Sequence, residues 1–238
     1  MDAVLNLEEA TLPRVDHFPA AKSMDGFKDE IARFVAERAR VSKKTVVVDV
    51  GCGVGDQMFR MAKAGAHRVY GIDRAEFSNN LRRLECEAAG ADPKNLYFYC
   101  QSMTELPHIN CRDMTGKVDV VVCQQAINYL PYTQALAVLK AMAAMLKPGG
   151  RLYISTPWMG SEIANGYEDA ALDVSSRFSR LSRAMSDKYQ TRDPVCLYWE
   201  KELAWSVHYA GMTVLKSLVS KATGEVMVIG ELDVAHSR

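Results

Sequence analysis

The sequence predicts an α/β fold built on a mainly parallel β-sheet. Between residues 27 and 157, short runs rich in β-branched residues alternate with segments of helical spacing. Such alternation implies parallel strands that are joined by helices. In addition, a glycine-rich turn at residues 51–55 lies directly between a strand and a helix, an arrangement in which helix N–H groups face a ligand.

Each element is predicted from its own pattern. A helix is expected over residues 27–41, because apolar residues recur there at intervals of three and four. Residues 45–50 are β-branched except at Asp49, which suits a strand buried on both faces. Residues 147–150 contain Pro and two Gly and are expected to end a helix in a turn. Helices are also expected over 56–64, 77–89, 133–146 and 200–209, and strands over 68–72, 95–100, 118–123, 151–155, 213–219 and 225–232.

The charge balance and the cysteine pattern exclude several classes of protein. Lys+Arg and Asp+Glu both number 29, so no net field draws the chain to nucleic acid or to acidic lipid. The six cysteines form no CxxC pair, and we expect reduced thiols in the core. The N-terminus lacks the apolar stretch of a secretory signal, and no run approaches the roughly 20 apolar residues that span a bilayer. We therefore expect a cytoplasmic protein with no metal site and no membrane partner.

The glycine-rich turn carries the strongest functional signal. Residues 48–56 read Val-Asp-Val-Gly-Cys-Gly-Val-Gly-Asp, and the bare glycines let a ligand approach the main chain closely. Asp73 ends the next predicted strand, where a carboxylate can accept hydrogen bonds from a ribose diol. The pattern predicts a site for a nucleoside-containing cofactor.

Asp56 helps to choose between two such cofactors. A dinucleotide fingerprint that starts at Gly51 needs a small residue at position 56, and a carboxylate at a helix N-terminus would repel a pyrophosphate. S-adenosylmethionine has no phosphate, and its sulfonium and amine tolerate carboxylates such as Asp49. The residues therefore favour S-adenosylmethionine over a nicotinamide dinucleotide.

Five segments in order resemble the motifs of class I S-adenosylmethionine-dependent methyltransferases that act on small molecules, over about residues 27–157. The segments are residues 46–55, 71–73, 100–107, 118–131 and 146–152. The resemblance implies a Rossmann-like three-layer α/β/α sandwich with a seven-stranded, mostly parallel sheet whose last strand is antiparallel. It also implies one domain over 1–238, divided into an N-terminal arm or lid (1–25), a cofactor-binding core (26–157), a helical insertion on the substrate side (158–198) and a C-terminal helix with two strands (199–238).

The same resemblance implies a set of cofactor contacts. Asp49 and the backbone of Gly51 and Gly53 would hold the methionine moiety, Asp73 the ribose, Ser102 and Met103 the adenine, and the Gln124 main chain the amino group, with Cys52 and Arg74 completing the set. Ser102 departs from the family pattern, which usually has Asp there, and a hydroxyl binds adenine more weakly than a carboxylate does.

The residues that act on the acceptor are less evident. Methyl transfer is an in-line displacement that alignment and exclusion of water can promote, whereas a hydroxyl acceptor would also benefit from a general base. Because ligands of open α/β sheets bind beyond the carboxyl ends of the strands, the candidates come from loops at that edge and from the arm. The catalytic candidates are Asn128, Tyr129 and His17, and the substrate-binding candidates are Gln125, Asn128, Tyr129, Tyr132, Trp158 and Phe18.

We expect transfer of a methyl group to an oxygen or nitrogen atom of a small molecule, by a chain that can form a homodimer. One alternative is an enzyme similar to messenger RNA cap guanine-N7 methyltransferases, which would need a basic channel beside Arg74, Arg82 and Arg83. Another is a non-catalytic module that binds S-adenosylmethionine. Arg177, Arg180 and Arg183 recur every three residues and are expected to form a solvated helical face.

Overall fold

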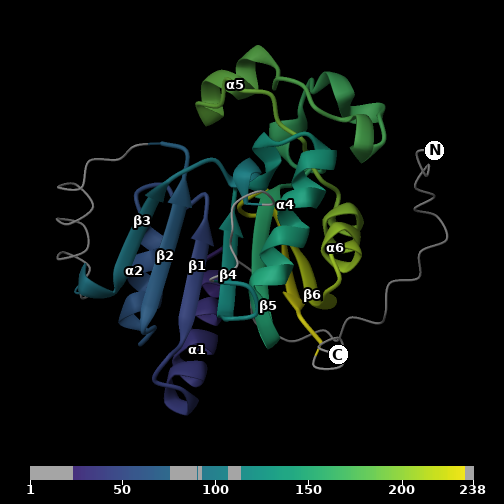
Figure 1. The fold of residues 1–238 in the computed structure, drawn as a ribbon. Helices are drawn as coiled ribbons and strands as arrows, with labels where there is room; N and C mark the ends of the chain where they lie inside the picture. The colour runs from purple at the N-terminus through teal and green to yellow at the C-terminus, as the bar shows by residue number, and fades with distance from the viewer. Residues whose placement is uncertain (1–23, 76–89, 91–92, 107–113, 234–238) are drawn as a thin grey trace.

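A seven-stranded sheet forms the centre of the molecule, in the order β3-β2-β1-β4-β5-β7-β6 (Figure 1). The computed structural model describes residues 24–75, 90, 93–106 and 114–233. The strands are β1 (Val46–Val50), β2 (Arg68–Asp73), β3 (Leu96–Cys100), β4 (Val118–Gln124), β5 (Leu146–Pro157), β6 (Thr213–Ser220) and β7 (Glu225–Glu231). β7 runs antiparallel to the other six strands named above, which are parallel to one another. The predicted mixed sheet, with the last strand antiparallel, is confirmed.

Helices cover both faces of this sheet. The helices are α1 (Met24–Val41), α2 (Asp56–Lys63), α4 (Tyr132–Met145), α5 (Arg183–Tyr189) and α6 (Glu200–Tyr209). In Figure 1, α4 and α6 lie in front of the sheet and α1 and α2 behind it. Val47 packs into the core on the α1 side, while Val48 and Val50 pack into the core on the α4 side. Burial on both faces explains the almost unbroken β-branched sequence of β1.

Two predicted boundaries, the starts of α1 and β5, differ from the structure by three residues or more. The helix α1 begins three residues before the predicted start at residue 27. Residues 147–150, which were expected to form a turn, belong to β5, which shifts register against β4 between Val118 and Val120. Lys147 Nζ lies 2.7 Å from Asp119 Oδ2, a carboxylate that is 3% exposed and also accepts a hydrogen bond from the backbone of Val46. Backbone hydrogen bonds from Gly149 N to the Leu232 carbonyl and from Leu232 N to the Gly150 carbonyl extend the strand, and the ion pair adds to them. The predicted helix over 77–89 lies outside the described residues.

The insertion at residues 158–198 is less helical than expected. Besides the seven-residue α5, it contains the 3₁₀ segments Glu162–Ala164, Glu168–Ala171 and Val174–Ser176. Its two ends meet in a bridge between Trp158 and Tyr198. The insertion lies beyond the carboxyl ends of the parallel strands, at the top of Figure 1, so it covers the edge at which a ligand would bind.

Arg177 does not belong to a solvated helical face, as the three-residue spacing had predicted. It follows a 3₁₀ segment and is 3% exposed. Its Nη1 donates to Glu202 Oε2 at 2.8 Å and to the carbonyl of Leu197 at 2.7 Å, and its Nη2 donates to the carbonyl of Leu172 at 2.7 Å. Glu202 belongs to α6, so this buried ion pair fastens the insertion to the sheet's helical layer.

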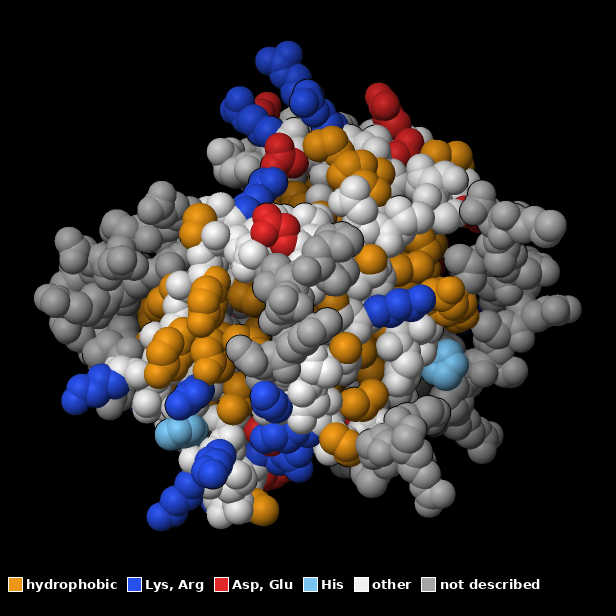
Figure 2. Space-filling view, viewed as in Figure 1, with side chains coloured by type: hydrophobic (Ala, Val, Ile, Leu, Met, Phe, Trp, Pro, Cys, Tyr) orange, Lys and Arg blue, Asp and Glu red, His pale blue; other side chains and the backbone are white. Residues whose placement is uncertain are grey.

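The prediction that the cysteines are buried in the core is correct for two of the four cysteines that the structure describes. Cys123 and Cys196 are buried, whereas Cys52 is half-buried and Cys100 is exposed. Cys100 ends the edge strand β3, over which hydrophobic side chains also gather on the surface (Figure 2). An edge strand has a neighbour on one side only, which explains its exposure. Among the helices of the described ranges, none combines the length and apolar content that crossing a bilayer requires.

Replacing Arg177 by Leu should destabilise the protein strongly, because Glu202 would be left buried without its partner. We expect a loss of about 3–5 kcal/mol in the free energy of unfolding, measured by urea denaturation. The exposed Arg180→Leu serves as the control and should stay within about 0.5 kcal/mol of the original chain. Equal stability of the two variants would contradict the anchoring role of Arg177.

Candidate active site

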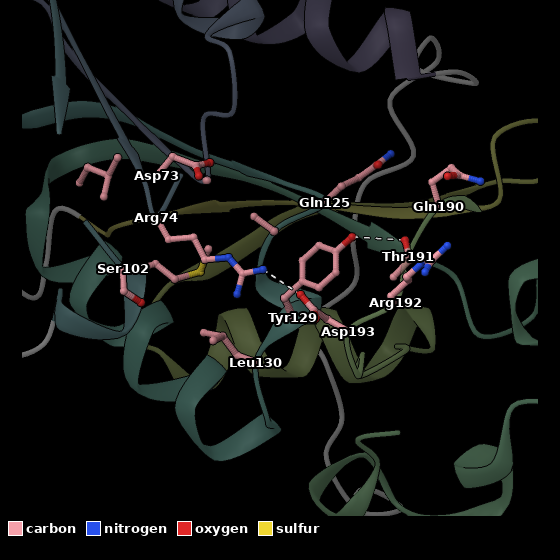
Figure 3. Close-up of a pocket in the computed structure, with 14 residues that line it drawn as sticks. Asp73, Arg74, Ser102, Gln125, Tyr129, Leu130, Gln190, Thr191, Arg192 and Asp193 are labelled. Carbon is pink, nitrogen blue, oxygen red and sulfur yellow. Dashed lines mark hydrogen bonds and ion pairs between the residues drawn. The ribbon is translucent and has the colours of Figure 1, made fainter. Parts of the chain in front are cut away.

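A cavity of about 360 Å³ opens at the carboxyl edge of the sheet (Figure 3). Segments that are far apart in the sequence form its walls. These are Gly51 of the glycine turn, Ile72, Asp73 and Arg74 of β2 and its end, Ser102 and Met103 after β3, Gln125, Ala126, Tyr129 and Leu130 after β4, and residues 190–193 of the insertion. Residues of four of the five predicted motifs therefore meet around one space, whereas residues 146–152 do not line it.

The glycine turn has the conformation that its sequence suggests. Gly51 and Gly53 have φ angles of +75° and +52°, a region that favours glycine. A Cβ atom at position 51 would clash with Cβ of Ala126, whereas one at position 53 would meet no atom of the described residues within 4 Å. The close packing of Gly51 leaves no room for a side chain there, whereas the space beside Gly53 is open.

Asp73 both holds the glycine turn and keeps acceptor capacity for a ligand. Its Oδ2 accepts a hydrogen bond from Gly53 N and its Oδ1 accepts one from Ala75 N, each at 2.9 Å. Because a carboxylate oxygen has two lone-pair sites, each oxygen can accept a further hydrogen bond. The prediction that Asp73 binds ribose hydroxyls is compatible with this geometry.

Asp49 is a buried carboxylate without a neutralising partner. It is 3% exposed, and burial, with the negative charge of Asp73 as the second cause, raises its pKa to about 7. Among the described residues, no basic side chain pairs with Asp49 or Asp73. A ligand cation beside Asp49 would favour its ionised form. The residues therefore fit the sulfonium and ammonium charges of S-adenosylmethionine.

Gln57, in the first turn of α2, is a buried polar residue that the sequence analysis did not consider, and it lines neither cavity. It is buried, and both its amide nitrogen and its amide oxygen lack hydrogen-bond partners among the described residues. Buried polar atoms are usually paired, so such an amide calls for a ligand or a water. Its position directly after the glycine turn was the available signal.

The other predicted cofactor contacts lie at or near this cavity. Ser102 and Met103 line it, although the Ser102 hydroxyl already bonds Oγ1 of Thr104 at 2.8 Å and caps a short 3₁₀ helix, Met103–Glu105. Cys52 lies within the glycine turn and Gln124 ends β4. Their contacts with a cofactor remain predictions.

The insertion closes over the cavity through two contacts that Figure 3 shows as dashed lines. Arg74 Nη2 lies 2.8 Å from Asp193 Oδ2, and the Tyr129 hydroxyl lies 3.5 Å from Oγ1 of Thr191. The sequence analysis missed residues 190–193, because no local pattern links them to motifs more than 60 positions earlier. Arg74 thus contributes an ion pair to the wall, in addition to its predicted role beside the cofactor.

A second cavity, of about 160 Å³, adjoins the first and shares Gln125, Tyr129 and Thr191 with it. Asn128 lines its wall, as does Glu225, the first residue of β7. The sequence analysis missed Glu225, since a single Glu at a strand end has no distinctive pattern. Among the described residues, no group of three or more His, Cys, Asp or Glu is arranged to hold a metal ion.

Two predicted substrate contacts lie away from both cavities. Tyr132 is 3% exposed in the core, where its hydroxyl accepts a hydrogen bond from Ser206 at 3.3 Å. Trp158 packs edge-on against Trp199, with ring centroids 6.3 Å apart. These two side chains fill space between structural elements, so neither faces an acceptor here. His17 and Phe18 lie outside the described residues.

Comparisons with known proteins place this architecture among methyltransferases. The family model for a methyltransferase domain matches residues 41–211. A ubiquinone biosynthesis O-methyltransferase from Aeromonas salmonicida (strain A449) is 34% identical over 110 residues, or 46% of this chain. The match covers 42% of that relative, so the chain spans less than half the length of this curated protein.

Solved structures share the fold over most of the chain. The 1,6-didemethyltoxoflavin-N1-methyltransferase from Burkholderia thailandensis, with bound 1,6-didemethyltoxoflavin and S-adenosylhomocysteine, has a TM-score of 0.57 and 17% identity, covering 92% of this chain and 93% of that one. The [4+2]-cyclase SpnF has a TM-score of 0.59 and 16% identity, covering 92% and 86%. At these identities the likeness concerns the fold alone.

Replacing Asp49 by Asn should stabilise the ligand-free protein above neutral pH. Because folding raises the pKa of Asp49 from 3.8 to about 7, the folded state binds the extra proton, and stability falls as the pH rises between about 4 and 7. We expect Asp49→Asn to gain on the order of a few kcal/mol at pH 8, and much less at pH 5.

Urea denaturation at both pH values measures this effect. The matched control is Asp56→Asn, which changes an exposed carboxylate at the start of α2. An Asp49→Asn variant that is less stable than the original chain at pH 8 would show that the carboxylate is neutralised in the folded protein, against our interpretation.

Proposed function

The chain belongs to the methyltransferase domain family, and from that premise we propose that it is an S-adenosylmethionine-dependent methyltransferase with a small-molecule acceptor. The observation that carries the proposal is the pair of carboxylates at the glycine turn, Asp49 and Asp73, without a basic partner among the described residues. Such a site suits a cationic nucleoside and disfavours phosphates.

Asp56 supports the same choice of cofactor. It is the first residue of α2 and is exposed, so its charge lies at the helix N-terminus where a dinucleotide would place its pyrophosphate. A carboxylate there repels phosphate oxygens. This disfavours the nicotinamide alternative.

The cofactor roles fall on Gly51 and Asp73, which line the cavity, and on Asp49 and Gly53, which lie beside Gly51 in the chain but not on the cavity wall. We assign the ligand's positive charges to Asp49, the main-chain contacts to Gly51 and Gly53, and the ribose hydroxyls to Asp73. When bound, S-adenosylmethionine supplies a methyl carbon that its sulfonium activates. The chain's own part is to orient the two reactants and to exclude water beneath residues 190–193 of the insertion.

A small acceptor is supported by the size of the second cavity and by the distribution of charge. The cavity measures about 160 Å³, and acidic and basic side chains are mixed over the insertion above it (Figure 2). Arg74, which a cap-binding channel would need, is paired with Asp193. The name of the Aeromonas relative, an O-methyltransferase, favours an oxygen acceptor. The cytoplasmic location and the homodimer stay predictions.

Calorimetric titration with S-adenosylmethionine, S-adenosylhomocysteine and NAD tests the cofactor. We expect both adenosyl ligands to bind and NAD not to bind. Asp73→Asn should weaken binding at least about tenfold, because it removes charge-assisted hydrogen bonds. The exposed Asp187→Asn on α5 is the control, with thermal unfolding to check that each variant folds. Binding of NAD alone would overturn the proposal.

Transfer of a labelled methyl group to fractionated cell extract tests the acceptor. We expect label in the small-molecule fraction, because the second cavity holds only a compact group. Label found only in RNA or protein would contradict the small-molecule assignment. Binding of the adenosyl ligands with no transfer to any fraction would favour the non-catalytic alternative.

A further inference from the structure

We propose that the smaller cavity is the acceptor subsite, and that Glu225 receives the proton from a hydroxyl group on a single-ring acceptor. This inference rests on the proposed methyltransferase function. It adds a residue, a subsite and a class of acceptor to that function.

The antiparallel direction of β7 brings Glu225 to the functional edge. Glu225 begins β7 and pairs with Pro157, the last residue of β5. Because β7 runs against the other strands, its first residue lies beside their carboxyl ends, where the cofactor cavity opens. Gln125 and Tyr129 belong to the walls of both cavities, so an acceptor in the smaller cavity would lie next to a methyl donor in the larger one.

Glu225 is buried, and its carboxylate uses only part of its hydrogen-bonding capacity. Its residue is 4% exposed, and Oε2 accepts a hydrogen bond from the Thr223 hydroxyl at 3.2 Å. No basic side chain forms an ion pair with it within the described part of the chain. Lys28 of α1 influences it electrostatically. The carboxylate therefore has free acceptor sites beside the cavity.

The turn before β7 does not require this carboxylate. Gly224 N donates to the Ser220 carbonyl at 2.8 Å, and Thr223 N donates to the Ser220 hydroxyl at 3.3 Å. These two bonds close the turn without Glu225. A buried carboxylate that is costly to desolvate and not needed for the local fold indicates a role toward a ligand.

The state of Glu225 suits proton transfer near neutral pH. Burial is the largest influence on its pKa and raises it to about 7, against the opposing effects of Thr223 and Lys28. Among the described residues, the other titratable groups on the cavity wall are Tyr129 and Tyr189. A base works best when its pKa is close to the operating pH, and Glu225 meets that condition.

The cavity matches one ring that carries a hydroxyl group. A cavity of roughly 150 Å³ accommodates benzene, and this one measures about 160 Å³. Apolar residues form part of its wall, including Ile163, Val195 and Leu197. Asn128 lies on the same wall, and its buried Oδ1 accepts no hydrogen bond from the described residues. Two acceptor groups call for a ligand that brings donor hydrogens.

The proposed step balances with S-adenosylmethionine as the methyl donor. A lone pair of the acceptor oxygen forms the bond to the methyl carbon, and the carbon–sulfur bond breaks with its electron pair remaining on sulfur. The hydroxyl proton passes to the Glu225 carboxylate, which releases it to solvent after the ether product leaves. The products are the methyl ether, S-adenosylhomocysteine and one proton.

The test compares the original chain with Glu225→Gln and with Glu231→Gln, a matched change at the other end of β7. Calorimetry with S-adenosylhomocysteine comes first, and we expect all three proteins to bind it alike. Binding of phenol and of anisole to each complex is then measured by saturation-transfer NMR. Phenol has the hydroxyl proton that anisole lacks, while the ring is the same.

We expect phenol to bind the original chain and Glu231→Gln equally, and Glu225→Gln roughly ten- to a hundredfold more weakly, as loss of a hydrogen bond to a charged group predicts. Anisole should bind all three proteins weakly. If phenol does not bind, or binds the three proteins equally, the inference about Glu225 is overturned. The proposed function still stands in that case, provided that S-adenosylhomocysteine binds. Failure of the original chain to bind S-adenosylhomocysteine overturns both.

A measurement on the unmutated chain covers the case in which Glu225→Gln does not fold. Carbon-13 NMR of the side-chain carboxyls follows the titration of Glu225, whose signal a Glu225→Asp variant assigns by its loss. We expect a midpoint near pH 7 that shifts when phenol is added. A midpoint at the ordinary value for Glu, with no response to phenol, overturns the inference.

Discussion

The burial of the Asp49 carboxylate, beside the half-buried carboxylate of Asp73, is the constraint on which the site depends. Burial, with the negative charge of Asp73 as the second cause, raises the pKa of Asp49 to about 7. Backbone donors from Gly53 and Ala75 hold Asp73 in place, but they do not cancel its charge. A cationic ligand lowers the electrostatic cost of keeping these two carboxylates ionised. The site is therefore less stable without a ligand, and this difference favours binding of a cation.

The insertion converts the open edge of the sheet into two cavities. The buried ion pair of Arg177 and Glu202 attaches the insertion strongly to α6. At the cavity itself the contact is the pair of Arg74 and Asp193, whose side chains are 71% and 57% exposed. Exposed ion pairs contribute about 0–1 kcal/mol. The insertion is thus firmly anchored at its base and weakly held where a ligand must enter.

The errors of the sequence analysis share one physical origin. Tyr132 and Trp158 were placed at the substrate because they follow motifs, yet the first packs in the core and the second against another Trp. The spacing of Arg177 suggested a solvated face, and residues 147–150 suggested a turn. In each case a contact with a residue distant in sequence, such as Glu202 or Asp119, outweighed the local pattern.

The sequence by itself determined the central sheet, the glycine turn and the position of Asp73, because a buried strand, a tight turn and a helix each follow from residues within a few positions. The tertiary structure decided which distant residues complete the site. Residues 190–193 and Glu225 reach the cavities only because the insertion folds back over the sheet and β7 runs antiparallel. Both depend on long-range packing, which leaves no periodic signal along the chain.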